Sequence, residues 1–296
     1  MGHFERDPHT GHMTTGHEWN GITELNTPVP KVIWLFLSAA VLFAVGYWIL
    51  MPTWPLGRTY TKGLLGDDQH QIVAQAVKQA ALDRAVWSAR IENESFADIQ
   101  KDPRLMEAVR ETGRTLFGDN CAACHGRTAQ GGKGFPNLTT ASWLWGGTPE
   151  AIFDTIRVGI NSAHPETRNA QMPAFGKDGM LPRADIDKVI AFVRSLSPPN
   201  AKDPKKDLDP AKVAAGKELF AANCASCHGE EAKGSTEVGA PDLTDAFWIY
   251  GGDPASIAQT LWNGRQGHMP TWENRLSTLD RKILALYLVD LRSRKQ

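Results

Sequence analysis

The stretch GRTLFGDNCAACHG at residues 113–126 recurs as GKELFAANCASCHG at residues 216–229, and this repeated motif decides the fold. The similarity continues outward from both copies. Each copy is followed, in the same order, by Pro-x-Leu-Thr, Trp-x-Trp/Tyr-Gly-Gly, a Thr/Asp-Pro helix start and a Met-Pro pair. Each unit is predicted to end in an amphipathic helix, at 185–196 in the first copy and 279–291 in the second. The sequence therefore predicts two copies of one small helical domain.

All the cysteines of the chain belong to two C-x-x-C-H motifs, which are the attachment signature of c-type haem. The cysteines are Cys121, Cys124, Cys224 and Cys227, and the histidines that follow them are His125 and His228. On one helical turn the two thiols lie on one face, where they can form thioethers with the vinyl groups of one haem. The histidine then points at the iron. A thioredoxin-like redox pair would need a βαβ setting, which these helical repeats lack. A structural zinc site would need the two cysteine pairs to converge across the linker between the repeats. We therefore predict two covalently bound haem c groups per chain.

A methionine is predicted to fill the remaining axial position of each iron. In the second repeat the only methionine is Met269, and in the first the alignment favours Met172 over Met180 because Met-Pro recurs. His164 and His268 are rival ligands, and His268, adjacent to Met269, is expected at the surface. His/Met ligation leaves no open coordination site and raises the reduction potential. Such a centre passes single electrons.

Other repeat residues are predicted to build the haem pockets. Phe117 and Phe220 can meet Phe192 and Tyr287 on the C-terminal helices, as two amphipathic helices bury a shared face. The proline of each Pro-x-Leu-Thr segment could orient the proximal imidazole through its backbone carbonyl. The Trp-x-Trp/Tyr-Gly-Gly segments could contact haem edges or propionates, or could serve only as core and turn.

An uncharged run, VIWLFLSAAVLFAVGYWILM, occupies residues 32–51 and is long enough to cross a bilayer as one helix. Aromatic residues lie near both of its ends, and Pro52 and Pro55 follow it. The run starts too late and is too long for a signal peptide. A core helix of this length would carry a polar face. We therefore predict one retained transmembrane helix in contact with the lipid bilayer.

The predicted fold is all-α, with one N-terminal transmembrane helix followed by two tandem class I cytochrome c domains. The segments are a tail at 1–31, the transmembrane helix at 32–51, a helical connector at 52–108, cytochrome c domains at 109–197 and 211–296, and a proline-rich linker at 198–210. The histidines of the tail are irregularly spaced. They are interpreted as unstructured polar residues rather than a metal site.

Composition and charge exclude other classes of protein. The formal net charge of −1 argues against a nucleic-acid-binding protein, and 4 cysteines are too few for a disulfide scaffold. The basic residues flanking the apolar run are balanced, so they do not set its orientation. Covalent haem attachment takes place outside the cytoplasmic membrane in bacteria. We therefore expect the tail in the cytoplasm and residues 52–296 in the periplasm, anchored to the inner membrane.

The tail sequence HEWNGITELNTPVPK at 17–31 and the segment GYWILMPTWP at 46–55 precede the two C-x-x-C-H domains. In this combination the chain resembles the dihaem subunit III of bacterial cbb3-type cytochrome c oxidase. Some members of that family have two membrane spans, whereas this sequence shows one. The resemblance implies iron ligands His125 with Met172 and His228 with Met269.

The resemblance also implies the role of the chain. Such a subunit accepts electrons from a cytochrome c donor and relays them through its two haems to a monohaem subunit. The electrons then reach the catalytic haem–copper subunit, which reduces O₂ and pumps protons. The chain would be an electron-transfer subunit of the oxidase, not its catalytic subunit.

Two other functions are less well supported by the sequence. A cytochrome subunit of a periplasmic dehydrogenase would share the tandem haem domains, but such subunits usually carry three haem motifs and a signal peptide. A haem-based sensor or peroxidase would need a weak or absent distal ligand. The Met-Pro pair in each repeat argues against that requirement.

Overall fold

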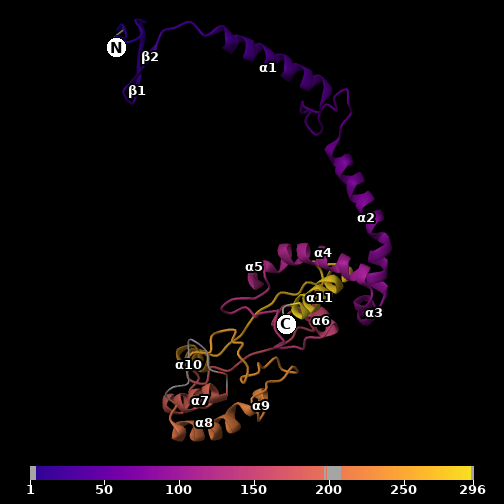
Figure 1. Cartoon of the computed structure of the whole chain (residues 1–296), viewed down its shortest axis with the longest axis vertical. Coiled ribbons are helices and arrows are strands. Elements are labelled where there is room, and N and C mark those ends of the chain that lie inside the picture. The colour runs from indigo at the N-terminus through magenta and orange to yellow at the C-terminus, as the bar shows by residue number, and fades with distance from the viewer. Residues whose placement is uncertain (1–4, 197, 199–207, 295–296) are drawn as a thin grey trace. The chain divides into compact units, whose positions relative to one another are not determined.

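The computed structural model describes residues 5–196, 198 and 208–294, in two compact units that comprise 1–83 and 84–296. Residues 199–207, most of the predicted linker, lie outside the described residues. The described chain is mostly helical, as predicted (Figure 1).

The N-terminal tail contains a β-hairpin, contrary to the expectation of unstructured polar residues. Strand β1 (Thr14–Trp19) pairs antiparallel with β2 (Ile22–Leu25). The turn between them is Asn20-Gly21, with φ of 52° and 85°. Asn-Gly is the strongest short hairpin signal because both turn positions require positive φ. The hairpin is therefore encoded by a local turn signal in the tail.

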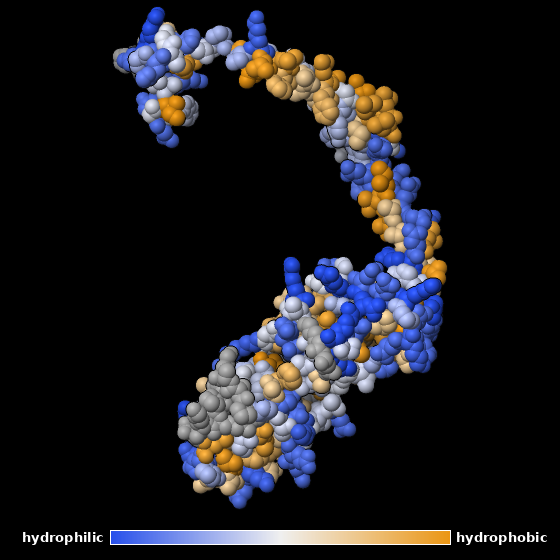
Figure 2. All heavy atoms as spheres, viewed as in Figure 1, coloured by the Kyte–Doolittle hydropathy of each residue, from blue (hydrophilic) through white to orange (hydrophobic). Residues whose placement is uncertain are grey.

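The apolar helix α1 (Lys31–Leu50) agrees with the predicted 32–51 to within one residue. None of its residues is buried, and its mean hydropathy is 2.2. Among the described residues it is the one helix long and apolar enough to cross a membrane. Hydrophobic residues cover the visible face of α1 (Figure 2).

The remaining helices follow from cap chemistry and apolar periodicity. They are α2 (Gln69–Asn93), α3 (Phe96–Lys101), α4 (Pro103–Asn120), α5 (Ala122–His125), α6 (Pro149–Val158), α7 (Arg183–Leu196), α8 (Pro210–Asn223), α9 (Ala225–His228), α10 (Pro254–Asn263) and α11 (Thr278–Ser293). Helices α4, α6, α8 and α10 each begin with Pro after an Asp or Thr whose side chain caps the first turn. The two predicted Thr/Asp-Pro starts are therefore confirmed.

Within residues 84–296 the helices pair across the two repeats. Helix α4 packs on α11, and α7 packs on α8, so the first helix of each repeat contacts the last helix of the other (Figure 1). The aromatic contacts follow the same exchange. The ring centroids of Phe117 and Tyr287 lie 6.1 Å apart, and those of Phe192 and Phe220 lie 5.2 Å apart. The four predicted aromatic residues do meet, with partners from opposite repeats.

The exchange produces two apolar cores, each drawn from both repeats. Core A combines α4 and α6 with α11, and its buried members are Phe117, Ala129, Ile152, Ile156, Trp272, Leu284, Ala285 and Leu288. Core B combines α7 with α8 and α10, and its buried members include Phe175, Ile186, Phe192, Phe220, Cys224, Ile257 and Leu261. The packing units are therefore not the sequence segments 109–197 and 211–296.

The end of the predicted connector also packs against the second repeat. Ile91 and Ile99 are fully buried, in one cluster with Ile283 and Leu286 of α11. Burial of these side chains removes apolar surface from water and stabilises the exchanged position of α11.

Two glycines permit the exchanged helices to approach closely. A Cβ atom on Gly113 of α4 would lie 2.6 Å from Cβ of Tyr287, and one on Gly216 of α8 would lie 2.1 Å from the carbonyl oxygen of Lys188. Real carbon atoms do not approach so closely. Glycine is therefore required at both positions, which match each other in the repeat.

We expect Gly113→Ala to lower the free energy of unfolding by about 1–3 kcal/mol, because the added methyl group overpacks the contact with Tyr287. Gly118→Ala, on the same helix with nothing within 4 Å, is the matched control. It should leave stability unchanged or raise it by about 0.5–1 kcal/mol. Denaturant unfolding measures both, and equal stability of Gly113→Ala and the unaltered protein would contradict the α4–α11 packing.

Candidate haem sites

Each C-x-x-C-H motif forms a short helix directly after a long one. The N–H of Cys121 bonds the carbonyl oxygen of Phe117, at 2.9 Å, and the N–H of Cys224 bonds that of Phe220, at 2.8 Å. Glycine then ends each short helix, with φ of 74° at Gly126 and 76° at Gly229. The thiols and the histidine of each motif are therefore positioned by the long helix that precedes them.

The imidazole rings are oriented as predicted, by proline carbonyls. Nδ1 of His125 lies 3.2 Å from the carbonyl oxygen of Pro136, and Nδ1 of His228 lies 3.0 Å from that of Pro241. A carbonyl can only accept, so Nδ1 carries the hydrogen and Nε2 keeps its lone pair for a metal. Burial lowers the pKa of both histidines, which favours the neutral, metal-binding form.

All four thiols are free, and they differ in exposure within each motif. Burial raises the pKa of Cys121 and of Cys224 to about 11, so both are protonated at neutral pH. Cys124 and Cys227 are exposed. The described residues contain no group of three or more His, Cys, Asp or Glu side chains that could hold a metal ion. This finding gives the zinc alternative no support.

The two methionines lie in the opposite order to the one implied by the repeat. Met269 packs against core A, as Cys121 does. Met172 packs against core B, which contains Cys224. Each methionine therefore lies beside the core that contacts the other repeat's cysteine. The pairing of His125 with Met172 and of His228 with Met269 stays a prediction. Met180 is 55% exposed, and the preference for Met172 stays a prediction.

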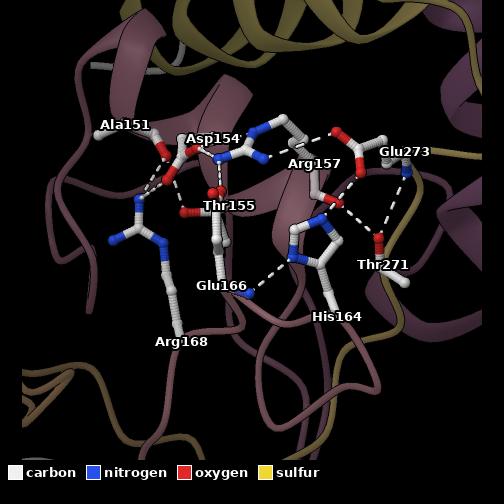
Figure 3. Close-up of polar contacts among 9 residues, drawn as sticks. All are labelled: Ala151, Asp154, Thr155, Arg157, His164, Glu166, Arg168, Thr271 and Glu273. Carbon is white, nitrogen blue, oxygen red and sulfur yellow. Dashed lines mark hydrogen bonds and ion pairs between the residues drawn. The ribbon is translucent and has the colours of Figure 1, made fainter.

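The rival histidines are engaged elsewhere. Nε2 of His164 lies 2.8 Å from Oε2 of Glu273, and its Nδ1 accepts from the N–H of Glu166 at 3.0 Å (Figure 3). His268 is exposed, as expected, and its Nδ1 donates to the carbonyl oxygen of Asn161 at 2.9 Å. Both ring nitrogens of His164 are thus occupied without an iron.

One cavity of about 1520 Å³ contains both candidate sites. It is lined by all four cysteines, both motif histidines, Met172 and Met269. Pockets for one small molecule usually enclose roughly 300–1,000 Å³. The cavity is therefore large enough for two groups, which agrees with two haems.

Unpartnered donors show that the cavity suits an acidic group. Nε1 of Trp145, Nε1 of Trp248 and an Nη of Arg265 are buried, line the cavity and have no hydrogen-bond partner within the described part of the chain. Buried polar atoms normally have partners. Haem propionates would supply carboxylate acceptors, so these residues fit the group. Both tryptophans belong to the Trp-x-Trp/Tyr-Gly-Gly segments, for which propionate contact was one prediction.

The fold and these two sites define a c-type cytochrome. Three family models match the chain: the N-terminal domain of cytochrome oxidase-cbb3, FixP, at residues 11–58, cytochrome c at 110–197, and cytochrome c oxidase, cbb3-type, subunit III at 211–288. A FixP subunit of a cbb3-type cytochrome c oxidase from Bradyrhizobium sp. (strain ORS 278) is 47% identical over 98% of both chains. CcoP subunits from Azospirillum brasilense and Rhodobacter capsulatus are 43% and 41% identical over 98% and 94% of this chain and 99% and 95% of their own. The chain belongs to the FixP/CcoP family of cbb3-type cytochrome c oxidase subunits.

We expect Arg265→Gln to lower the reduction potential of one haem. A positive charge beside a haem favours the reduced iron, so its loss favours the oxidised state. Arg275→Gln is the matched control, since both guanidinium groups stack on an aromatic ring, at 4.3 Å for Arg265 and 4.0 Å for Arg275, and only Arg265 lines the cavity. Spectroelectrochemical titration measures both variants. Equal shifts in the two would contradict the placement of Arg265 beside a haem.

We expect Glu273 to stabilise the fold less in acid. The hydrogen bond with His164 lowers the pKa of Glu273 below its ordinary value of 4.5. A carboxylate whose pKa is lowered in the folded state stabilises the fold at any pH above its ordinary pKa. This stabilisation is lost as the pH falls through the lowered pKa. The unaltered protein should therefore have a higher free energy of unfolding than Glu273→Gln. The difference should be constant near neutral pH and shrink below pH 4.5. Denaturant unfolding over a pH series measures it, and a difference independent of pH would contradict the prediction.

Proposed function

We propose that this chain is a membrane-anchored dihaem electron relay in a cbb3-type terminal oxidase. Its C-x-x-C-H motifs hold two haem c groups as thioethers, one on Cys121 and Cys124 and one on Cys224 and Cys227. Haem c supplies reversible one-electron chemistry. The observation that carries this proposal is the single cavity, which both cysteine pairs, both histidines and both methionines line.

The axial residues determine what the chain does with an electron. His125, His228, Met172 and Met269 are the side chains that would hold the two irons. A haem bound by one histidine and one methionine would have no position left for O₂. The chain therefore passes electrons, and O₂ is reduced in another subunit.

Contacts between the two halves of the cavity support transfer between the haems. The N–H of Gly134, beside the first motif, donates to the carbonyl oxygen of Ile249 at 2.8 Å, and Ser142 donates to Asp245. A Cβ on Gly239 would lie 2.4 Å from the Trp145 ring, so that ring lies directly on the backbone there. These contacts hold the two haem-binding segments next to each other.

The apolar helix α1 anchors this relay in the bacterial inner membrane. We place the N-terminal tail in the cytoplasm and the haem domains in the periplasm, because c-type haem is attached outside the cytoplasmic membrane. The electron donor is a cytochrome c, and the acceptors are the monohaem and haem–copper subunits. The net charge of −1 offers no support for a nucleic-acid partner.

The test is a purification of the tagged full-length chain from its native membrane in mild detergent. We expect a haem-staining chain that co-purifies with a monohaem cytochrome and a b-haem subunit, and O₂ uptake driven by reduced cytochrome c. The control replaces all four cysteines with alanine, which keeps α1 and should abolish the haem stain of this chain and the O₂ uptake. Co-purification of a periplasmic dehydrogenase without O₂ uptake would overturn the assigned role.

A further inference from the structure

We infer that the loop at residues 52–66 binds anionic phospholipid at the C-terminal end of α1. Its apolar side chains enter the edge of the hydrocarbon layer, and its basic side chains contact the lipid phosphates. The inference rests on the proposed membrane anchoring by α1, and it adds a lipid site that the haem relay does not use.

Hydrogen bonds hold the end of this loop beside the last turn of α1 (Figure 1). The N–H of Leu64 bonds the carbonyl oxygen of Ile49 at 3.0 Å, and the N–H of Leu65 bonds that of Leu50 at 3.1 Å. The last carbonyl groups of a helix have no partner within the helix, so these bonds satisfy two of them. Leu64 and Leu65 therefore lie level with the last turn of the apolar helix.

A glycine permits the loop to cross the helix end so closely. Gly63 has φ of 69°, and a Cβ atom there would collide with the carbonyl group of Leu50. Positive φ and close backbone contact both require glycine. Gly66 also has a positive φ, of 66°, but a Cβ there would meet nothing within 4 Å. The backbone contact is therefore specific to Gly63, and it holds the loop against α1.

The first half of the loop also contacts α1. The ring centroids of Trp54 and of Trp48, which belongs to α1, lie 5.1 Å apart. The hydroxyl of Thr53 donates to the carbonyl oxygen of Met51 at 2.7 Å, and the N–H of Thr61 bonds that of Trp54 at 2.9 Å. Both halves of the loop are thus attached at the end of α1, so the position of α1 in the bilayer sets the depth of the loop.

Large apolar side chains of the loop are exposed. Leu64 is 78% exposed, Leu56 62% and Leu65 60%. Such a group is unfavourable in water, and its burial in hydrocarbon removes the apolar surface from water. Trp54 and Tyr60 are also exposed, and both belong to the residue types enriched where hydrocarbon meets the headgroups. The edge of a lipid bilayer therefore suits this loop.

The charge of the loop favours anionic lipid. Arg58 and Lys62 are exposed, and no acidic residue occurs between Glu24 and Asp67. Long basic side chains lay their methylene groups along apolar surface and keep their charge at the headgroups. Basic groups next to a membrane span attract anionic phospholipids. The phosphate of such a lipid is therefore the partner that fits these two side chains.

The first test measures the depth of the loop in the complex purified with the full-length chain and returned to a bilayer. Because the four native cysteines hold haem in the proposed relay, Leu64→Cys supplies one free thiol of this chain for a nitroxide spin label. We expect this label to collide more with O₂, which enters hydrocarbon, than with a water-soluble nickel chelate. Thr115→Cys, exposed on α4, is the control and should show the reverse. The labelled unaltered complex gives the background of the other subunits.

The glycine contact is tested with the same label. Gly63→Ala should lower the preference of the Leu64→Cys label for O₂, because the added methyl group displaces the loop from the end of α1. Gly66→Ala is the matched control, since its φ is also positive and its added methyl group meets nothing. It should leave the preference unchanged.

The second test compares spin-labelled phosphatidylglycerol with spin-labelled phosphatidylcholine bound to the full-length, haem-loaded chain in bilayer vesicles. The unaltered chain should prefer phosphatidylglycerol. Arg58→Gln with Lys62→Gln should reduce this preference by about 2–5-fold. Lys212→Gln with Lys217→Gln removes two exposed charges from α8 and should leave the preference unchanged. This control separates a contact at the loop from an effect of net charge.

The outcomes separate this inference from the proposed function. A label at residue 64 that collides more with the nickel chelate, or that another subunit shields from both reagents, would overturn the lipid site. Equal lipid preference of the Arg58→Gln, Lys62→Gln variant and the unaltered chain would also overturn it. A chain without covalent haem, or one that does not co-purify with oxidase subunits, would overturn the proposed function itself.

Discussion

The close crossing of α4 with α11 and of α8 with α7 is the constraint on which the haem sites depend. Gly113 and Gly216 bring helix backbones within reach of each other, and the aromatic contacts of Phe117 and Phe220 follow. Each C-x-x-C-H motif begins at the C-terminal end of one of these helices. The position of the cysteines and of the proximal histidine is therefore set by helix packing between the repeats.

The surroundings of the cavity are matched to a charged, one-electron cofactor. Carbonyl groups fix the tautomer of His125 and His228, and burial keeps both rings neutral. Unpartnered donors, Arg265 among them, face the cavity and suit carboxylates. Together these features suit a cofactor that carries carboxylates and needs a neutral imidazole ligand.

Local signals in the sequence predicted much of this structure. The haem motifs, the Thr/Asp-Pro helix starts and the orienting prolines depend on short spacings, which tertiary context does not alter. The Asn20-Gly21 hairpin depends on an equally local turn signal. The burial of Ile91 and Ile99 was not predicted, because their partner helix α11 lies far away in the sequence. Arg265 became a candidate for haem contact through its unpartnered donor, which only the tertiary structure reveals. Trp145 and Trp248 belong to segments for which propionate contact was already one prediction from the sequence.

The sequence by itself determined the family, the two haem motifs, the apolar helix and the identity of all eight candidate haem-binding residues. It did not determine which apolar core each Met-Pro segment packs against. The physical reason is the repeat itself: Phe192 and Tyr287 are equally able to pack on Phe117 or Phe220, and either Met-Pro strand can pair with either helix end. Tertiary structure decided between these arrangements. Met172 packs against core B and Met269 against core A, and Glu273, which follows Met269, contacts His164 and Arg157.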